Sequence, residues 1–512
     1  MKRFMKYMIL LYLVFAFPSC DILDENPKDF VSPQNFYNTE DEVTSALFGV
    51  YSMLHNTYIG DAERIFIGDL GVDVMICRDQ PHKNVYQFYM MESPTVEMTQ
   101  IWQSFYQGIG AANMVIARTA SSSLRSEFKS QVIAEAKVLR AFFYHGLITL
   151  WGDVPMWLEE LNLEQVATLP RTSRSTLIQQ LYTDFDSALA WLPDKYDSDN
   201  LGRVTRWAAE GLWARIALLE NDWDKAYELS SDIIQHSPHE LLKEYADVFD
   251  WKNKFNKELM LVIPCLTDIQ GSTIHSFCSP RGRDEAAAFL PLFQKGLKAI
   301  RPDGVIVGST TELFEGWGMF CTSETYLASF EEGDRRKALM DWSSLEMTDG
   351  SIIPFNGGDG GGKGHYTLKW SAFGEKANNG SRDIHHIRLA EMYLIHAEAA
   401  NELNKHEEAV AGLNVLRERA FGDSLHNYPS SLTKNAIKQA IVNENKWELG
   451  GEGLRRWYLN HWGFDYLNDA VQSMKDENPK GAQNIRPHHI LFKIPVEEFV
   501  KNPNLGDNNP GY

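Results

Sequence analysis

The chain has 512 residues, of which 44% are hydrophobic and 23% are charged, and its formal net charge is −20 at pH 7. This is the composition of a globular protein, and it excludes a fully disordered chain and a multi-span membrane protein. The acidic balance would repel phosphate backbones, which argues against nucleic acid as a partner.

The first 20 residues have the pattern of an export signal. Basic residues precede an uncharged apolar stretch at positions 8–17, which is too short to span a bilayer. Ser19 then precedes Cys20, and a small residue directly before a cysteine resembles the bacterial lipobox. We therefore expect residues 1–19 to be a lipoprotein signal peptide and Cys20 to carry the lipid anchor. An ordinary secretory signal with an incidental cysteine is the alternative.

Helical periodicity dominates the mature chain. The spacing of apolar residues predicts amphipathic helices over residues 39–55, 97–120, 126–150, 174–191, 205–220, 223–236, 386–403, 406–419 and 433–448. Between about 251 and 380 this periodicity ends, and glycine, proline and aromatic residues crowd around short β-like runs such as 259–264. We expect a mostly α-helical fold for residues 20–512, with an N-terminal helical part (20–250), a loop-rich insertion (251–380) and a C-terminal part of helices and loops (381–512).

Small residues recur at one spacing in two places. The two sets are Ala214, Ala217 and Ala226, and Ala397, Ala400 and Ala409. Each set crosses a short turn, so we expect two antiparallel helix pairs whose small residues let the helices approach closely. The pattern resembles the tetratricopeptide repeat. Because the copies are far apart in the sequence, the helix pairs must be interleaved within one large fold.

The sequence carries no positive signal for catalysis, a metal or a cofactor. Residues 357–364, GGDGGGKG, copy the start of a phosphate-binding loop but lack its Ser or Thr. The adjacent histidine pairs at 385–386 and 488–489 cannot share one helical face, as metal ligands on a helix would. Acidic clusters such as 331–334 could hide a glycosidase pair, although a solvated helix face explains them as well. We predict a protein that is not an enzyme and that uses no metal and no cofactor.

The mature chain has four further cysteines: Cys77, Cys265, Cys278 and Cys321. Their spacing matches no metal site. Export would permit disulfides, but a chain of this length does not need them, and we expect mostly free, buried thiols.

Four segments, in order along the chain, resemble the SusD/RagB family of outer-membrane nutrient-binding lipoproteins. The first joins Cys20-Asp21 to the helix FYNTEDEVTSALFGVYSML, and the second is EAKVLRAFFYHGLITLWGDVP at 135–155. The third joins TSETYLASFEEGDRR at 322–336 to IRLAEMYLIHAEAANEL. The fourth joins NKWELGGEGLRRWYLNHW, from Asn445, to LFKIPVEEFVKNPNLGDNNPGY at the end of the chain.

The resemblance implies tetratricopeptide-like helix pairs as a scaffold and an irregular face that carries the ligand. It implies a lipoprotein on the surface of the outer membrane of a Gram-negative bacterium, anchored through its lipid alone, that acts as a lid on a SusC-like TonB-dependent transporter. The ligand would be an oligosaccharide, or sometimes a peptide, which is handed on without cleavage. The sequence does not identify the glycan. The alternatives are a helical surface scaffold without sugar affinity and an exported helical glycoside hydrolase.

The resemblance also places the ligand site on loops that follow the first long helix and within the middle region. Aromatic rings beside charged side chains suit sugars, whose rings have apolar faces and polar rims. We expect Tyr86 and Trp317 to stack on sugar faces, with Phe320 as a third apolar wall. Asp73 and Arg78 would bind hydroxyls through charge-assisted hydrogen bonds. Local packing is the alternative for each of the aromatic residues.

Overall fold

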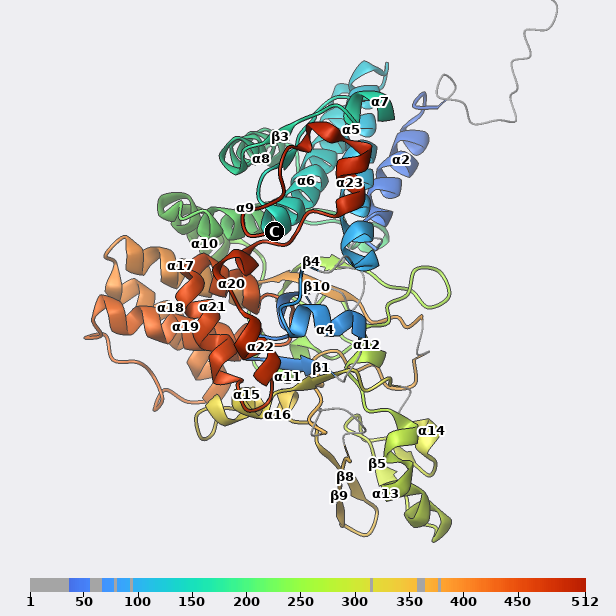
Figure 1. The fold of residues 1–512 in the computed structure, drawn as a ribbon, viewed down its shortest axis with the longest axis vertical. Coiled ribbons are helices and arrows are strands. Elements are labelled where there is room, and N and C mark those ends of the chain that lie inside the picture. The colour runs from blue at the N-terminus through green and yellow to red at the C-terminus, as the bar shows by residue number, and fades with distance from the viewer. Residues whose placement is uncertain are drawn as a thin grey trace, which may run out of the picture.

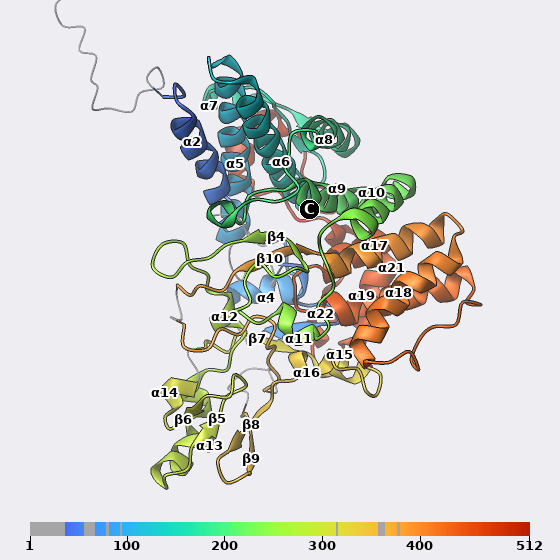
Figure 2. The same cartoon turned by 180° about the vertical axis from the view of Figure 1, so that it is seen from behind.

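The computed structural model describes residues 36–55, 67–77, 81–92, 95–313, 316–356, 364–375 and 379–512. Figures 1 and 2 show a group of long helices at the top, a C-terminal helical group to one side, and a small lobe that projects at the lower end. Among the residues so described, no helix is long and apolar enough to cross a membrane. The expected signal peptide and Cys20 lie outside these ranges.

All nine helices predicted from periodicity are present. They are α2 (Glu40–Ser52), α5 (Val96–Ser121), α6 (Ser126–Trp151), α8 (Arg174–Leu189), α9 (Arg206–Leu219), α10 (Trp223–His236), α17 (Leu389–Glu402), α18 (His406–Phe421) and α19 (Lys434–Leu449). Several start at a capping side chain. Thr39 accepts a hydrogen bond from the backbone N–H of Glu42, whose side chain in turn caps the Thr39 N–H. This satisfies donors that the first turn of a helix leaves open.

The two longest helices, α5 and α6, pack closely along their length (Figure 1). Gly108 of α5 lies under the ring of Phe143, and Gly146 of α6 lies under the ring of Phe105. A Cβ atom at either glycine would stand 2.4–2.6 Å from the facing ring. Each helix therefore has a glycine where the other helix inserts a phenylalanine ring. Helices α2 and α8 pack against this pair.

The predicted helix pairs are α9 with α10 and α17 with α18, and α10 packs against α17. All six alanines of the repeated spacing are fully buried. The turns are also alike, since Asn221 and Asn404 both take the left-handed conformation, with φ of 61° and 62°. The expected interleaving is confirmed: two pairs that are remote in sequence stack side by side and join the two helical parts.

The middle region is more regular than its sequence suggests. Strands β5 (Ala299–Ile300), β6 (Ile306–Val307), β8 (Ser344–Met347) and β9 (Ile352–Pro354) form one sheet in the order β6-β5-β8-β9. Together with α13 (Gly282–Gln294) and α14 (Thr310–Leu313) they build the projecting lobe. The lobe has its own apolar core around Phe289, Trp342 and Phe355. The predicted loop-rich insertion thus contains a small ordered lobe, which the sequence did not reveal because its strands are too short to leave a clear period-two pattern.

Two strand pairs tie the middle region to the helical parts. Strand β1 (Met75–Cys77) pairs with β7 (Phe320–Thr322), and the predicted strand β4 (Leu259–Ile263) pairs with β10 (Ile384–Arg388). The four cysteines after Cys20 are buried and form no disulfide with one another.

The remaining elements are short. They are α4 (Pro81–Gln87), β2 (Val154–Pro155), α7 (Leu163–Val166), β3 (Arg171–Thr172), η1 (Ser198–Asn200), α11 (Tyr245–Val248), α12 (Ile274–Phe277), α15 (Glu324–Ser329), α16 (Lys337–Met340), α20 (Arg455–Trp462), α21 (Phe464–Ser473), α22 (Pro479–Asn484), η2 (Pro487–Ile490), α23 (Val496–Lys501) and η3 (Pro503–Leu505).

Candidate functional site

Asp73, expected to bind sugar hydroxyls, is instead part of the core. Its side chain is 9% exposed, and its two carboxylate oxygens accept hydrogen bonds from Nε and Nη2 of Arg455, each at 3.0 Å. Burial alone would raise the pKa of the Asp73 carboxyl, but the Arg455 guanidinium, with Lys446 nearby, lowers it below its ordinary value. The residue is a structural anion, and the expectation that it meets ligand is corrected.

Tyr86 and Phe320 are also buried. Both are 0% exposed, Tyr86 in α4 and Phe320 in β7. The Tyr86 hydroxyl lies 2.8 Å from the Thr95 hydroxyl, and the Phe320 ring stacks on Phe277 with centroids 5.5 Å apart. Neither ring offers a face to a sugar, so these two expectations are corrected as well: the rings fill space between segments that are distant in sequence. The other two predicted site residues, Arg78 and the anchor Cys20, lie outside the described ranges.

Trp317 is half-buried at the surface. Its ring meets Phe277 edge to face, with centroids 4.6 Å apart, and its backbone N–H donates to the carbonyl oxygen of Ser276 at 2.6 Å. The glycine before it has a role that the sequence did not reveal. A Cβ atom at Gly316 would stand 2.2 Å from the carbonyl oxygen of Ser279, so glycine permits close contact between these two backbones.

A cleft of about 540 Å³ lies between the projecting lobe and the loops above it. Its described lining residues are His275, Ser279, Arg301, Val305, Ile306, Val307, Thr311, Glu312, Gly316, Trp342, Ala372, Phe373 and Gly374. This volume is in the usual range for small-molecule sites, roughly 300–1,000 Å³. Gly316 belongs to the lining, so Trp317 is the chain neighbour of a residue in the cleft wall.

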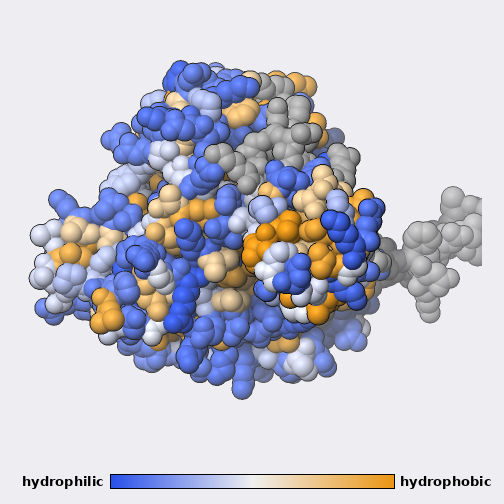
Figure 3. All heavy atoms as spheres, turned by 90° about the horizontal axis from the view of Figure 1, so that it is seen from below, coloured by the Kyte–Doolittle hydropathy of each residue, from blue (hydrophilic) through white to orange (hydrophobic). Residues whose placement is uncertain are grey.

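The cleft combines aromatic surface with fixed polar groups. Trp342 and Phe373 meet edge to face with centroids 5.4 Å apart, and Phe373 is half-exposed. The guanidinium carbon of Arg301 lies 5.2 Å from the Phe373 ring centroid, and its Nη1 donates to the backbone carbonyl of Glu312 at 3.0 Å. Viewed from below, the face that carries the lobe has apolar patches among polar residues (Figure 3), and exposed Val305 and Ile306 give the cleft an apolar rim.

The charge pattern of the cleft suits binding of a neutral polar molecule. Arg301 is paired with Asp303 through two hydrogen bonds of 2.7 and 3.0 Å. Among the described lining residues Glu312 is the one carboxylate, whereas glycoside hydrolysis usually employs two. The sequence showed that aromatic residues crowd the middle region, but it gave no sign of Arg301, whose position beside Phe373 depends on the fold.

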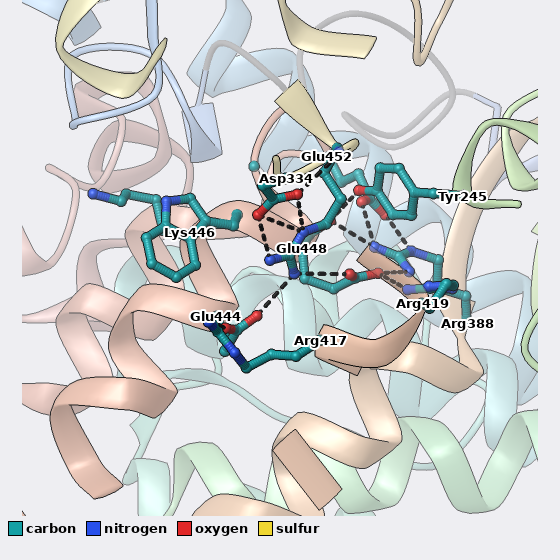
Figure 4. A network of polar contacts seen from close by, with 12 residues as sticks. Tyr245, Asp334, Arg388, Arg417, Arg419, Glu444, Lys446, Glu448 and Glu452 are labelled. Atoms are coloured by element: carbon teal, nitrogen blue, oxygen red, sulfur yellow. Dashed lines mark hydrogen bonds and ion pairs between the residues drawn. The ribbon is translucent and has the colours of Figure 1, made fainter. Parts of the chain in front are cut away.

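Glu448 and Glu452, from segment 445–462, are not among the described lining residues of this cleft and belong instead to a buried ion-pair network (Figure 4). Its members are Arg336, Lys369, Arg388, Arg417 and Arg419 with Glu258, Asp334, Glu444, Glu448 and Glu452. Glu448 is paired with three arginines, and its side chain is 0% exposed. The five cations face these five buried carboxylates, and Arg417 also pairs with the more exposed Glu331, so each buried charge has a partner and removing one member would leave another uncompensated.

Comparison with known proteins gives consistent results. The family described as "SusD family" matches residues 356–512, and the one described as "Starch-binding associating with outer membrane" matches residues 21–218. SusD-like protein P25 of Formosa agariphila is 29% identical, covering 98% of both chains. A SusD-like protein of Bacteroides ovatus is 25% identical, over 99% of this chain and 98% of that protein.

Solved structures confirm the fold. A laminarin binding SusD-like protein superposes with a TM-score of 0.74 at 23% identity, over 93% of this chain and all of the other. Surface glycan-binding protein A from Bacteroides fluxus gives a TM-score of 0.73 at 22% identity, over 93% of this chain and 100% of that one. At these identities the similarity establishes the mostly α architecture.

Proposed function

The chain belongs to the SusD/RagB family, and from this we propose that it binds an oligosaccharide at the cell surface in the cleft beside the lobe. The observation that carries the proposal is the position of Arg301 against the half-exposed ring of Phe373 inside that cleft. A sugar ring can stack its C–H face on the phenylalanine while Arg301 and Glu312 meet its hydroxyls. Two of the structural neighbours are described as glycan-binding or laminarin-binding, which supports this ligand class.

Calorimetric titration tests the proposal. Residues 21–512, which lack the signal peptide and the anchor cysteine, are titrated with a panel of soluble polysaccharides that includes laminarin and starch. We expect one of them to bind and Phe373→Ala to weaken that binding about tenfold, since an aromatic stack contributes on the order of 1 kcal/mol beyond its buried area. Trp191→Ala is the matched control, because Trp191 is 49% exposed and does not line the cleft.

Two outcomes would count against the proposal. If the Phe373→Ala variant and the unchanged protein bind the glycan with equal affinity, the binding site is not this cleft. Release of new reducing ends from the bound glycan would favour the hydrolase alternative, since we propose that the protein binds its ligand without cleaving it.

The family also supports a proposal for anchoring and transport. We propose that lipidated Cys20 holds the protein to the outer membrane and that it delivers the glycan to a SusC-like TonB-dependent transporter. Cys20→Ala should give a folded protein that no longer sediments with membranes, because a chemical anchor is lost. Co-purification of the lipidated protein with a transporter-sized outer-membrane partner tests the second step.

A further inference from the structure

A second, smaller hollow of about 290 Å³ lies directly beside the proposed glycan cleft. Its described lining residues are Ala246, Phe249, Asp250, Trp251, Lys252, Pro302, Asp303, Leu339, Leu368, Ser371 and Phe373. Phe373 belongs to both linings, so the two hollows are neighbours across one side chain.

An ion pair and one aromatic ring form the wall between them. Arg301 lines the first hollow and Asp303 lines the second, and the two side chains are joined by hydrogen bonds of 3.0 and 2.7 Å. The Arg301 guanidinium lies over the Phe373 ring at 5.2 Å. The segment that carries Phe373 also lines both sides, with Ser371 facing the second hollow and Gly374 the first. A ligand that crosses this ridge would meet the polar edge of the ion pair and the apolar face of the ring.

The second hollow has the same chemical character as the first. Trp251 is half-buried, with the Lys252 ammonium 5.5 Å from its ring centroid, and Asp250 is exposed beside it. Asp303 is an anion held by Arg301 and supplies hydrogen-bond acceptors at the wall. Both hollows thus present an aromatic ring next to groups of both signs, Arg301 with Glu312 in the first hollow and Lys252 with Asp250 and Asp303 in the second. That combination fits a neutral polyhydroxylated chain better than a charged ligand.

We propose that the two hollows are successive subsites of one extended site, and that the ligand is an unbranched oligosaccharide long enough to cross the Phe373–Arg301–Asp303 ridge. Trp251 then stacks on the sugar units beyond the ridge, and Phe373 contacts units on either side of it. This inference rests on the proposed function and adds a length requirement to it. Short oligosaccharides fill the first hollow alone, and longer ones gain contacts in the second.

A chain-length series decides the matter. Residues 21–512 are titrated with laminari-oligosaccharides from disaccharide to octasaccharide, and with the malto-oligosaccharide series if starch rather than laminarin binds. We expect affinity to rise with length and then to level off. Trp251→Ala should leave disaccharide affinity unchanged and weaken octasaccharide binding about tenfold, while Trp251→Phe, which keeps a flat ring, should retain most of the gain with length.

The variants separate failure of this inference from failure of the proposed function. Phe373→Ala should weaken binding at every length. Suppose that Phe373→Ala weakens binding at every length but Trp251→Ala binds every length as the unchanged protein does. The cleft would then be the binding site, and the second hollow would not be a subsite. Loss of disaccharide binding in Trp251→Ala would also overturn the inference, since it would indicate a general disturbance. If the unchanged protein binds neither series, both the function and this extension of it fall for these glycans.

Discussion

Arg455 in α20 and Asp73, which precedes β1, form a two-pronged ion pair in the core, with both hydrogen bonds at 3.0 Å. The side chains are 3% and 9% exposed, and the two residues are 382 positions apart in the chain. The pair therefore joins the N-terminal and C-terminal parts of the fold. A residue that sequence reasoning assigned to the ligand is instead half of a buried structural link.

Asp73→Ala should destabilise the protein strongly and leave ligand affinity unchanged. Removing one partner of a buried ion pair leaves an uncompensated charge, which costs about 3–5 kcal/mol. Chemical denaturation measures this loss. The matched control is Glu240→Ala, which removes an ion pair at the surface. The side chains of Lys257 and Glu240 are 64% and 65% exposed, so this substitution should lower the free energy of unfolding by less than about 1 kcal/mol. A stable Asp73→Ala variant with weakened glycan binding would restore the original assignment.

The helices were predictable because their signals are local. The repeated alanines and the Asn turns specify each antiparallel pair within about 30 residues, and the structure places all of them as expected. The burial of Tyr86 could not be predicted in this way. Its ring packs against Phe492, which comes from the far end of the chain. The sequence around Tyr86 contains nothing that indicates so distant a neighbour.

The cleft was only partly predictable for the same reason. Its lining comes from loops before α13, from β6 and α14, and from the segment around Phe373, and these meet only in the folded chain. Aromatic composition drew attention to the middle region, where this cleft lies. Arg301, the cation of the cleft, belongs to no recognisable sequence motif. It binds Asp303 two residues further along the chain, but its contact with Phe373 depends on long-range packing.

Glu448→Gln should be among the most damaging substitutions at the network of Figure 4. Burial raises the pKa of the Glu448 carboxyl, but Arg419, Arg388 and Arg336 together bring it well below its ordinary value. A group with a depressed pKa stabilises the fold above its unfolded-state pKa, and this contribution is lost as the pH falls. The neutral amide removes it at all pH values, at a cost of about 3–5 kcal/mol. Urea denaturation at neutral pH measures it, with exposed Glu332→Gln as the control. Equal midpoints for the two variants would contradict the structural role.

A pH dependence should arise at His365, whose Nδ1 lies 2.6 Å from Asp341 Oδ1. The hydrogen bond to Asp341 raises the pKa of His365 above its ordinary value, and His365 in turn lowers the pKa of Asp341. The stabilisation from charged His365 is thus complete below an unfolded pKa of about 6.5 and is lost as the pH rises through the raised folded value.

The melting temperature of the unchanged protein should therefore drop from mildly acidic to mildly alkaline pH by more than that of His365→Gln. The difference should be worth less than about 1 kcal/mol, because the two side chains are 24% and 30% exposed. Parallel melting curves for the two proteins across this range would rule the pair out as a source of pH dependence.

Asp153→Ala should cost on the order of 1 kcal/mol by loosening the start of α8, which Asp153 holds beside the end of α6. Gly152 ends that helix with φ of 72°, and the Asp153 carboxylate accepts a hydrogen bond from the backbone N–H of Arg174 at 2.7 Å. The substitution leaves this first donor of α8 without its partner. Thermal unfolding should show the loss with unchanged glycan affinity. An unchanged midpoint together with lost binding would instead mark Asp153 as a ligand residue.

Trp317→Ala tests the one predicted aromatic that the structure leaves at the surface. Its indole is half-buried against Phe277, and the preceding Gly316 is part of the cleft wall. If the exposed part of the indole extends the stacking surface of the cleft, calorimetry on the bound glycan should show affinity weakened about tenfold. Trp191→Ala, an exposed tryptophan on another part of the molecule, should bind normally. A Trp317→Ala variant that melts at lower temperature but binds like the unchanged protein would show that this ring only packs on Phe277, and that stacking in the cleft depends on Phe373 instead.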